Sequence, residues 1–502
     1  MSHEFSDETL DPVDFKSSWK KERSVNEEGC QTKDIHTESV EIQSYEVFDQ
    51  EVQTDLDGDK GYYQLSESEN QDLADFLHSV EPMVMKCLAN NLKSHAFDGV
   101  VNQQDAATDA VTCVHTLCNA ELKEELQITG LSWNATGSTL AATYGRFDHE
   151  DWCTHRSTLC TWNLDRRAVK EDKPDTVIDS PCCLMCLEFH PVNPAWLVGG
   201  NFNGEVIVWD LSREDDLVVA TSGIGNDAHR EPVSKVHWIK SQSSKRREYD
   251  IISVSGDGKV LVWKVDLKKG RLKLSYGFVV MSQSLPRSMK VRGVRGDKEV
   301  GVTSISFSFD DPDLFVLGSE SGCIFKCNLH ASGNPAGSHI VSSVPLSSPV
   351  TFTYNPHHGP VHSVDCSNFH RNAFLSAGMD QCLRIYNMLQ TQPVLTIEPD
   401  DGYLFSAKWS PVRPAVLGAV TERGNLLLYD LRGGQMIPSH KLEASPNKAP
   451  VYSLQFNHHQ KKILATGDGQ GYIRVFKLGS SLTSMSGKDL EVLEGMVSTG
   501  TE

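Results

Sequence analysis

The chain has 502 residues, of which 39% are hydrophobic and 23% charged, a balance typical of a folded protein with room for more than one structural unit. No stretch approaches the roughly 20 consecutive apolar residues that a membrane-spanning helix needs, so we expect no direct membrane insertion. The formal net charge of −20 disfavours contact with phosphate backbones, so we expect no nucleic-acid partner.

Most of the negative charge lies near the N-terminus. Residues 1–110 hold roughly 25 Asp and Glu against 8 Lys and Arg, about −17, so the rest of the chain carries only about −3. Because residues 1–66 have few periodic apolar positions, we expect an acidic tail that is disordered on its own. The first residues also lack the apolar core of a secretory signal, which predicts reduced thiols in a cytosolic compartment.

Three short segments of this tail share a Gln followed by a small hydroxyl residue: Gln31-Thr32, Gln43-Ser44 and Gln53-Thr54. Each lies in an acidic, extended stretch that is compatible with β structure. Such a segment can add as a strand to the exposed edge of another protein's sheet. Chance polar dipeptides are the alternative. We predict partner-binding residues in the first and third segments, namely Gln31, Thr32, Gln53 and Thr54.

The sequence predicts an amphipathic helical segment at residues 67–94. Its apolar residues recur at three- and four-residue steps and form one stripe, which consists of Leu73, Phe76, Leu77, Val80, Val84, Cys87 and Leu88. Pro82 removes an intrahelical hydrogen bond, so we expect either two short helices or one bent helix. The stripe suits insertion into a partner's groove, with docking onto the rest of the chain as the alternative.

Residues 111–478 are predicted to be β structure that repeats seven times. The first strand of each repeat is expected to end at Trp133, Phe189, Trp238, Phe307, Cys366, Trp409 and Phe456. The third strand is expected to end just after Trp162, Trp209, Trp263, Cys327, Tyr386, Tyr429 and Phe476. These units resemble WD repeats, although only Trp209-Asp210 keeps the dipeptide unaltered. The fold class is therefore all-β, a seven-bladed WD-repeat β-propeller preceded by the acidic tail and the helix.

Two segments flank the last repeat. Residues 111–117 alternate apolar and polar side chains, and we expect them to supply the fourth strand of the last blade and so close the ring. After Phe476 the chain becomes rich in Ser and Gly. We therefore expect a flexible C-terminal tail at residues 479–502.

No arrangement of residues indicates catalysis, a cofactor or a metal site. Glycine-rich turns between second and third strands contain Asp257, Asp380 and Asp468, where WD repeats use an Asp to stabilise the turn. Cys183 and Cys186 are expected to be buried thiols rather than zinc ligands. The pairs His357-His358 and His458-His459 are expected to be solvated loop histidines. We predict a protein that binds other proteins and is not an enzyme.

An acidic tail with Gln-Thr motifs, a helix and a seven-bladed propeller resemble the layout of dynein intermediate chains. The resemblance is closest to the intermediate chains of the second cytoplasmic dynein, the retrograde motor of intraflagellar transport. It is carried by residues 94–99 (SHAFDG), 162–167 (WNLDRR), 204–213 (GEVIVWDLSR) and 409–414 (WSPVRP). It implies a location in the cytoplasm and cytoskeleton, the cilium and the ciliary base.

The resemblance also implies the partners. The propeller would bind a dynein 2 heavy chain, and the N-terminal segment would pair with a second, different intermediate chain. The Gln-Thr residues would bind a hub-type light chain, and the stripe at Leu73, Phe76, Leu77, Val80, Val84 and Leu88 would bind a roadblock-type light chain. The alternative is a WD-repeat substrate receptor of a cullin-RING ubiquitin ligase. Tyr429-Asp430-Leu431-Arg432 approaches the Trp-Asp-x-Arg pattern of such receptors, with Tyr in place of Trp.

Overall fold

The computed structural model describes residues 67–93, 110–149, 152–241, 248–286, 289–290, 298–331, 333–335, 337, 340–434 and 436–498. The predicted acidic tail and its residues Gln31, Thr32, Gln53 and Thr54 lie outside these ranges. Within the described residues, no helix is both long and apolar enough to span a bilayer.

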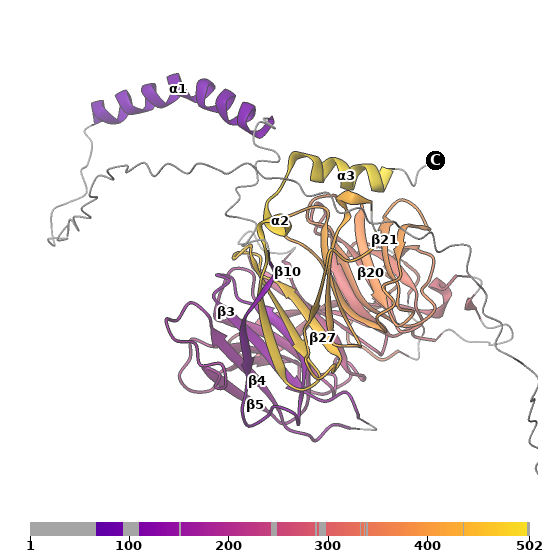
Figure 1. The fold of residues 1–502 in the computed structure, drawn as a ribbon. Helices are drawn as coiled ribbons and strands as arrows, with labels where there is room; N and C mark the ends of the chain where they lie inside the picture. The colour runs from indigo at the N-terminus through magenta and orange to yellow at the C-terminus, as the bar shows by residue number, and fades with distance from the viewer. Residues whose placement is uncertain are drawn as a thin grey trace, which may run out of the picture. The chain divides into compact units, whose positions relative to one another are not determined.

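Helix α1 (Glu67–Lys93) continues through Pro82 without a break. The two-helix alternative is therefore wrong, and Figure 1 shows one ribbon that curves along its length. A proline inside a helix removes one backbone donor and pushes away the preceding turn, which bends the axis while the remaining hydrogen bonds hold the helix together.

The first three blades each contain four antiparallel strands. Blade 1 consists of β2 (Gln127–Trp133), β3 (Thr139–Gly145), β4 (Ser157–Asn163) and β5 (Thr176–Ser180). Blade 2 consists of β6 (Leu184–Phe189), β7 (Trp196–Asn201), β8 (Val206–Asp210) and β9 (Val218–Thr221). Blade 3 consists of β10 (Val233–Lys240), β11 (Tyr249–Ser255), β12 (Lys259–Asp266) and β13 (Arg271–Val279), with the short β17 (Leu346–Ser347) paired to β13.

The other four blades repeat this plan. Blade 4, which follows the 3-10 turn η2 (Ser282–Ser284), consists of β14 (Val302–Phe307), β15 (Leu314–Ser319), β16 (Ile324–Asn328) and β18 (Val350–Thr353). Blade 5 consists of β19 (Val361–Cys366), β20 (Ala373–Gly378), β21 (Leu383–Asn387) and β22 (Pro393–Ile397). Blade 6 consists of β23 (Leu404–Trp409), β24 (Val416–Thr421), β25 (Asn425–Asp430) and β26 (His440–Glu443), with the 3-10 turn η4 (Leu431–Gly433) after β25. Blade 7 consists of β27 (Val451–Phe456), β28 (Ile463–Asp468), β29 (Tyr472–Lys477) and β1 (Thr112–Cys118).

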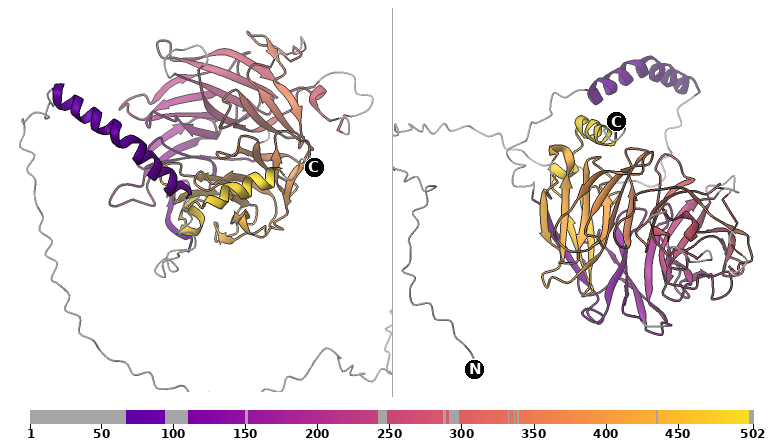
Figure 2. Two further views of the ribbon diagram at one scale, coloured as in Figure 1. Left: turned by 90° about the horizontal axis from the view of Figure 1, so that it is seen from above. Right: turned by 90° about the vertical axis from the view of Figure 1, so that its right-hand side faces the viewer.

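These seven blades confirm the predicted β-propeller. The first strands of neighbouring blades contact one another around the whole ring, including β2 with β27. Strand β1 pairs antiparallel with β29, from Thr112 opposite Lys477 to Cys118 opposite Tyr472. The two ends of the β structure therefore share one blade, and Figure 2 shows the purple N-terminal strands beside the yellow C-terminal ones.

The burial of the strands explains their composition. Second strands lie inside their blade and between neighbouring blades, so they are buried on both faces and read as apolar or small runs. Strand β24 (VLGAVT) and strand β20 (AFLSAG) are buried at every residue. First strands border the central channel and alternate instead, as in β27 (VYSLQF), where the second and fifth residues are only partly buried.

The tight turns after the second strands need backbone with positive φ. Gly258 and Gly471 supply it in two of the turns, with φ of 76° and 80°. In the turn after β20 a non-glycine residue, Gln381, has φ of 62°. Glycine adopts this conformation without the steric cost that a side chain brings, which explains its frequency in these hairpins.

The expectation of a flexible C-terminal tail is wrong for residues 480–498. They form helices α2 (Ser480–Thr483) and α3 (Gly487–Ser498), and Leu482, Leu493 and Val497 are buried. Figure 1 shows α3 lying across one end of the blade that contains β20 and β21. The Ser- and Gly-rich stretch before α3 suggested a tail, but apolar residues at helical spacing follow it and pack against blades 5 and 6.

Candidate functional site

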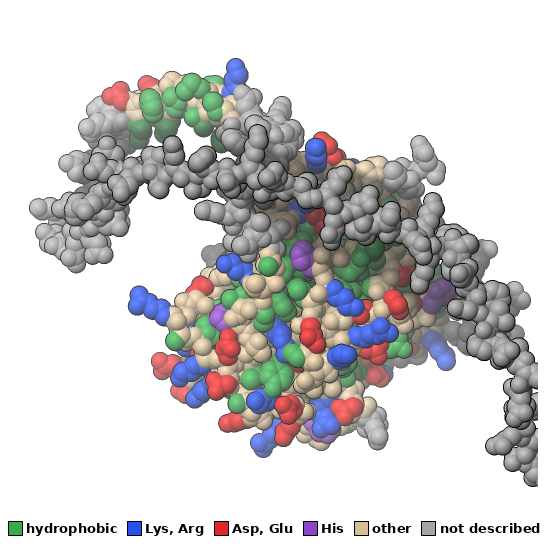
Figure 3. Space-filling view, in the orientation of Figure 1, with side chains coloured by type: hydrophobic (Ala, Val, Ile, Leu, Met, Phe, Trp, Pro, Cys, Tyr) green, Lys and Arg blue, Asp and Glu red, His purple; other side chains and the backbone are tan. Residues whose placement is uncertain are grey.

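The apolar stripe of α1 is exposed. Side chains are described for residues 71–88, and the exposed fraction is 59% for Phe76, 55% for Leu77 and 53% for Leu88. Leu73 and Val84 are exposed as well, and Val80 is partly buried. Figure 3 shows hydrophobic side chains gathered along this helix. The structure thus brings the predicted stripe together on one helix.

Two blades contain a Ser, a His and an Asp that are hydrogen-bonded in series. In blade 3, Nε2 of His229 lies 2.7 Å from Oγ of Ser253, and its Nδ1 lies 3.1 Å from Asp257. The indole N–H of Trp263 donates to the same hydroxyl over 2.8 Å. In blade 5, His357 lies 2.7 Å from Ser376 and 2.8 Å from Asp380.

These sets have the hydrogen-bond order of a hydrolytic triad, but their environment is different. Ser253 and Ser376 are fully buried, so a substrate cannot reach either hydroxyl. Each Asp also accepts a hydrogen bond from the backbone N–H two residues later, at Lys259 and at Cys382. The sets therefore stabilise the turns, as predicted for Asp257 and Asp380.

His357 is buried and hydrogen-bonded, so the prediction of a solvated histidine is wrong at this position. The neighbouring His358 and the pair His458-His459 are exposed, as expected. The histidine pattern alone did not distinguish them, because the partner of His357 lies 23 residues further on at Asp380. Although burial opposes it, the hydrogen bond from His357 lowers the pKa of Asp380 to about 2.

Asp468 lies at a different position in its turn. It ends β28, and it accepts hydrogen bonds from the backbone N–H groups of Gln470 and Tyr472 over 3.0 and 2.9 Å. It also forms an ion pair with Arg474 at 3.1 Å. Asp468 thus stabilises its turn without a histidine partner among these contacts.

A channel of about 540 Å³ runs along the first strands at the centre of the propeller. Each blade contributes one equivalent side chain to its lining, and these are Ser132, Glu188, His237, Ser306, Asp365, Lys408 and Gln455. The charged members of this ring pair with each other. Lys408 lies 2.9 Å from Asp365, and His237 lies 2.8 Å from Glu188.

These pairs shift the pKa values of His237 and Lys408. Burial would lower the pKa of His237, but Glu188 outweighs burial and raises it. Asp365 raises the pKa of Lys408 in the same way, against the effect of burial. The ring therefore consists of one lysine–carboxylate ion pair and one histidine–carboxylate pair, separated by neutral side chains. It stabilises the channel wall and does not resemble a catalytic centre.

The first strands share a structural irregularity. Every first strand has a β-bulge at its second or third residue, and the bulged residues are Thr129, Met185, Ser234, Thr303, His362, Phe405 and Tyr452. The hydroxyl groups of Thr129 and Ser234 donate to the next blade, at Leu184 over 2.6 Å and at Val302 over 2.8 Å.

The three bulges of blades 5 to 7 instead place rings side by side. Ring centroids lie 5.3 Å apart for His362 and Phe405, 4.9 Å for Phe405 and Tyr452, and 4.7 Å for Tyr452 and Phe147 of blade 1. Burial, together with the nearby charge of Lys235, lowers the pKa of His362 to about 4. His362 is therefore a neutral member of an apolar row at neutral pH.

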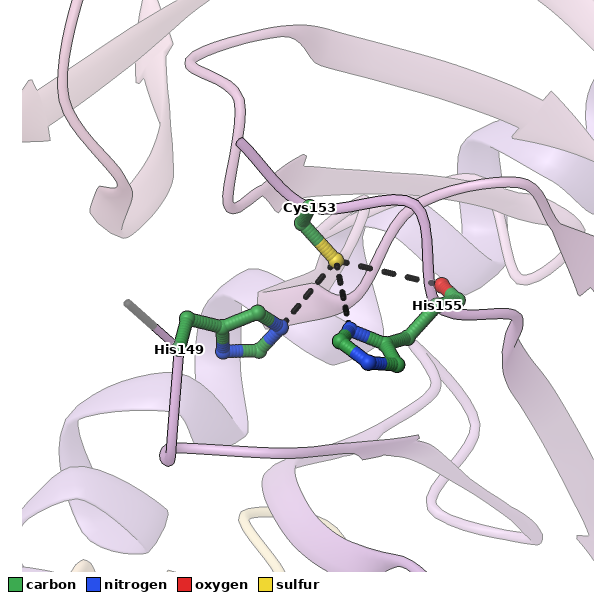
Figure 4. Close-up of side chains that lie close together, drawn as sticks. All are labelled: His149, Cys153 and His155. Carbon is green, nitrogen blue, oxygen red and sulfur yellow. Dashed lines mark hydrogen bonds between the residues drawn. The ribbon is translucent and has the colours of Figure 1, made fainter. Parts of the chain in front are cut away.

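A cluster of His and Cys side chains lies between blades 1 and 2, and the sequence interpretation missed it. Nε2 of His149 lies 3.0 Å from Sγ of Cys153, which lies 3.9 Å from Nδ1 of His155 (Figure 4). Within the part of the chain that the structure describes, these residues are the one group of three whose possible metal-ligand atoms all lie within 4.8 Å of one another. The spacing H-x3-C-x-H was the available signal.

Cys183 and Cys186 are both buried, as predicted, but their side chains contact different parts of the propeller. Sγ of Cys186 donates to the carbonyl oxygen of Val233 over 3.3 Å. Cys183 packs instead with Cys153 and Cys182, beside the His and Cys cluster.

The segment that suggested a ubiquitin-ligase receptor is engaged within the chain. Arg432 forms an ion pair with Asp430 at 2.7 Å and approaches Asp489 of α3 at 3.5 Å. Helix α3 contacts η4, which contains Arg432. These contacts give the receptor interpretation no support.

Comparison with known proteins gives two family matches. The family described as "Dynein axonemal intermediate chain 3 WD40 domain" matches residues 155–265, and the family "WD domain, G-beta repeat" matches residues 348–387. Both matches fall within the propeller.

Similar proteins are dynein subunits. Cytoplasmic dynein 2 intermediate chain 2 of Mus musculus is 41% identical over 493 residues, which cover 97% of this chain and 91% of the relative. The protein of the same name from Homo sapiens is 41% identical over 492 residues, with the same coverage. Dynein intermediate chain 3, ciliary, of Heliocidaris crassispina is 28% identical over 377 residues, which cover 74% of this chain and 57% of the relative. The chain therefore belongs to the dynein intermediate chain family, whose members are non-catalytic WD-repeat subunits of dynein motors.

Proposed function

We propose that this chain is an intermediate chain of cytoplasmic dynein 2, where it scaffolds heavy and light chains for retrograde intraflagellar transport and cilium assembly. The observation that carries the proposal is the 41% identity to cytoplasmic dynein 2 intermediate chain 2 over 97% of the chain. The corresponding location is the cytoplasm and cytoskeleton, together with the cilium and its base. The work of the subunit is to hold other proteins together.

In this proposal the propeller binds the dynein 2 heavy chain. A ring whose ends share one blade is a rigid platform, because the pairing of β1 with β29 holds the first and last strands of the ring together. The charged groups of the channel ring are already paired with one another. The faces and rims of the blades are the surfaces that we assign to the partner.

The apolar stripe of α1 binds a roadblock-type light chain. Leu73, Phe76, Leu77, Val84 and Leu88 are exposed on one side of the helix. Removal of such side chains from water is worth about 25 cal/mol per Å² of apolar surface, so a partner groove that covers the stripe gains several kcal/mol. A helix laid in a groove is recognised through side chains at this three- and four-residue spacing.

The acidic tail binds hub-type light chains through Gln31, Thr32, Gln53 and Thr54. A dimeric light chain has two grooves, so it can clamp the tail of this chain beside the tail of a second, different intermediate chain. After the first site is occupied, the second binds at a high effective concentration. Tandem motifs thus stabilise the pair of intermediate chains without further contacts.

The test is purification of the full chain with its native partners. We expect the variant with Gln31, Thr32, Gln53 and Thr54 changed to Ala to lose the hub-type light chain and keep the heavy chain. The variant Leu77→Asp/Val84→Asp should lose the roadblock-type light chain, because a carboxylate in an apolar groove must be desolvated without a partner. Quantitative mass spectrometry of the purified complexes measures both losses.

Matched controls come from the other side of α1. Asp75→Ala and His78→Ala lie opposite the stripe and should leave all partners bound. Recovery of cullin adaptors in place of dynein subunits would refute the proposal as a whole. Loss of heavy chain together with light chain from the tail variant would refute the division between tail and propeller.

A further inference from the structure

We propose that His149, Cys153, His155 and Cys183 form a zinc site at the junction of blades 1 and 2. The first three lie on the loop between β3 and β4, and Cys183 lies on the connection from β5 to β6. Figure 4 shows both imidazole rings turned towards the sulfur of Cys153. The proposal concerns neither the light-chain sites nor the heavy-chain surface, so it stands apart from the proposed function.

The distances fit a tetrahedral zinc ion. With Zn–S of about 2.3 Å and Zn–N of about 2.0–2.1 Å, two tetrahedral ligands place sulfur and nitrogen about 3.6 Å apart. The Cys153 sulfur lies 3.0 Å from the His149 nitrogen and 3.9 Å from the His155 nitrogen, on either side of that value. Changes of less than about 1 Å would bring both of these pairs to the tetrahedral spacing.

The central ligand is held in place by blade 2. The backbone N–H of Cys153 donates to the side chain of Asn203 over 2.9 Å, and the Asn203 amide donates back to the Cys153 carbonyl oxygen over 2.9 Å. The ring of His149 stacks on Phe202, with centroids 4.1 Å apart. Neighbours that fix the orientation of ligands in this way are typical of metal sites.

The fourth ligand is assigned to Cys183. Its backbone N–H donates to the Cys153 sulfur over 3.3 Å, which places the two residues side by side. Its own sulfur lies 4.0 Å from the carbonyl oxygen of His155. Cys183, Cys182 and Cys153 are buried together in one small cluster. A set of two thiolates and two imidazoles suits zinc, whereas Mg²⁺ and Ca²⁺ require oxygen ligands.

A closed set of four protein ligands leaves no position for a catalytic water, so the site is structural. The ion would tie the β3–β4 loop of blade 1 to the β5–β6 connection. Trp152, next to Cys153, has 60% of its surface exposed. Zinc would thus hold an exposed aromatic residue in a defined position at the surface of the propeller.

The experiment uses the full chain, stripped with a chelator and kept reduced. Titration with Zn²⁺ against a chromogenic chelator should reveal one tight equivalent, and Co²⁺ should give thiolate-to-metal absorption. Cys153→Ser and His155→Gln should weaken zinc binding at least about 100-fold, beyond the 10- to 100-fold cost of losing an outer partner. Cys113→Ser removes an exposed cysteine on β1 and should bind zinc as the unchanged chain does.

Thermal unfolding is a second measurement, which separates loss of the zinc site from misfolding of a variant. Zinc should raise the Tm of the unchanged chain and of Cys113→Ser, because binding to the folded state stabilises it, and should not raise that of His149→Gln. Failure of the unchanged chain to take up a tight equivalent would overturn the proposal, as would full zinc affinity in Cys153→Ser and His155→Gln. Full affinity in Cys183→Ser would overturn the assignment of the fourth ligand.

Discussion

His362 shows how one residue couples the stability of the ring to pH. Its ring packs against Phe405 at 5.3 Å, and its Nε2 is buried without a hydrogen-bond partner among the described residues. Burial is the main reason that its pKa falls from 6.5 to about 4. Protonation would place an unpaired charge in an aromatic row close to Lys235, whose charge opposes protonation of His362.

The sign of the effect follows from the lowered pKa. Between pH 6.5 and about 4 the unfolded chain binds a proton at His362 that the folded chain does not, so acidification favours unfolding. The shift corresponds to about 3 kcal/mol. We expect His362→Phe to lose less free energy of unfolding than the unchanged chain when pH falls from 7 to 4.5, as measured by urea denaturation.

His358→Gln is the control for this comparison, since it removes an exposed histidine four residues away. Its pH dependence should match that of the unchanged chain. Identical pH dependence in all three proteins would contradict the assignment to His362.

The C-terminal helix α3 is an element that depends on one buried ion pair. Nε and Nη2 of Arg413 donate to the two carboxylate oxygens of Asp489, over 2.8 and 3.1 Å, and both side chains are fully buried. Arg413 also pairs with Asp430 at 3.1 Å. Asn387 donates to the carbonyl oxygen of Val497 over 3.1 Å, near the end of the helix.

We expect Asp489→Ala to lower the free energy of unfolding by about 3–5 kcal/mol, because it leaves a guanidinium buried with less compensation. Denaturation by urea, followed by circular dichroism, measures this loss. Glu491→Ala changes an exposed acid on the same helix and should cost less than about 0.5 kcal/mol. Equal effects of the two substitutions would show that the buried pair does not hold α3.

The propeller as a whole is closed by strand β1, which lies more than 300 residues from its partner β29 in the sequence. A chain that begins at residue 110 keeps β1, and a chain that begins at residue 119 lacks it. Without β1, β29 becomes an open edge and the buried Leu117 loses its place in the core shared with Ile473 and Val475.

We expect the chain that begins at residue 119 to lose on the order of 5 kcal/mol, because several net backbone hydrogen bonds and apolar contacts disappear together. The chain that begins at residue 110 should keep the unfolding transition of the full chain. Thermal unfolding measured by calorimetry compares the two. A shared Tm would mean that the ring does not need β1 for closure.

Local sequence patterns determined the repeated part of the fold. The aromatic and apolar residues at strand ends and the alternation of first strands recur seven times, because each blade obeys the same steric rules. Turn glycines recur in most of the blades. The ends predicted at Trp133, Trp209 and Phe456 fall at or within one residue of the ends of β2, β8 and β27. The apolar stripe of α1 was visible for the same reason, since helical periodicity is local.

Contacts between distant residues could be decided only by the tertiary structure. His357 is buried because it forms hydrogen bonds with Asp380 and Ser376. Helix α3 packs on the propeller because Asp489 pairs with the buried Arg413. Cys153 lies beside Cys183 because two blades join there. In each case a polar side chain finds its partner across a turn or between blades. Sequence spacing indicates local structure, because it reflects contacts between residues that are close along the chain. The burial that shifts pKa values, orders the C-terminal helix and brings His and Cys side chains together arises only when the ring has closed.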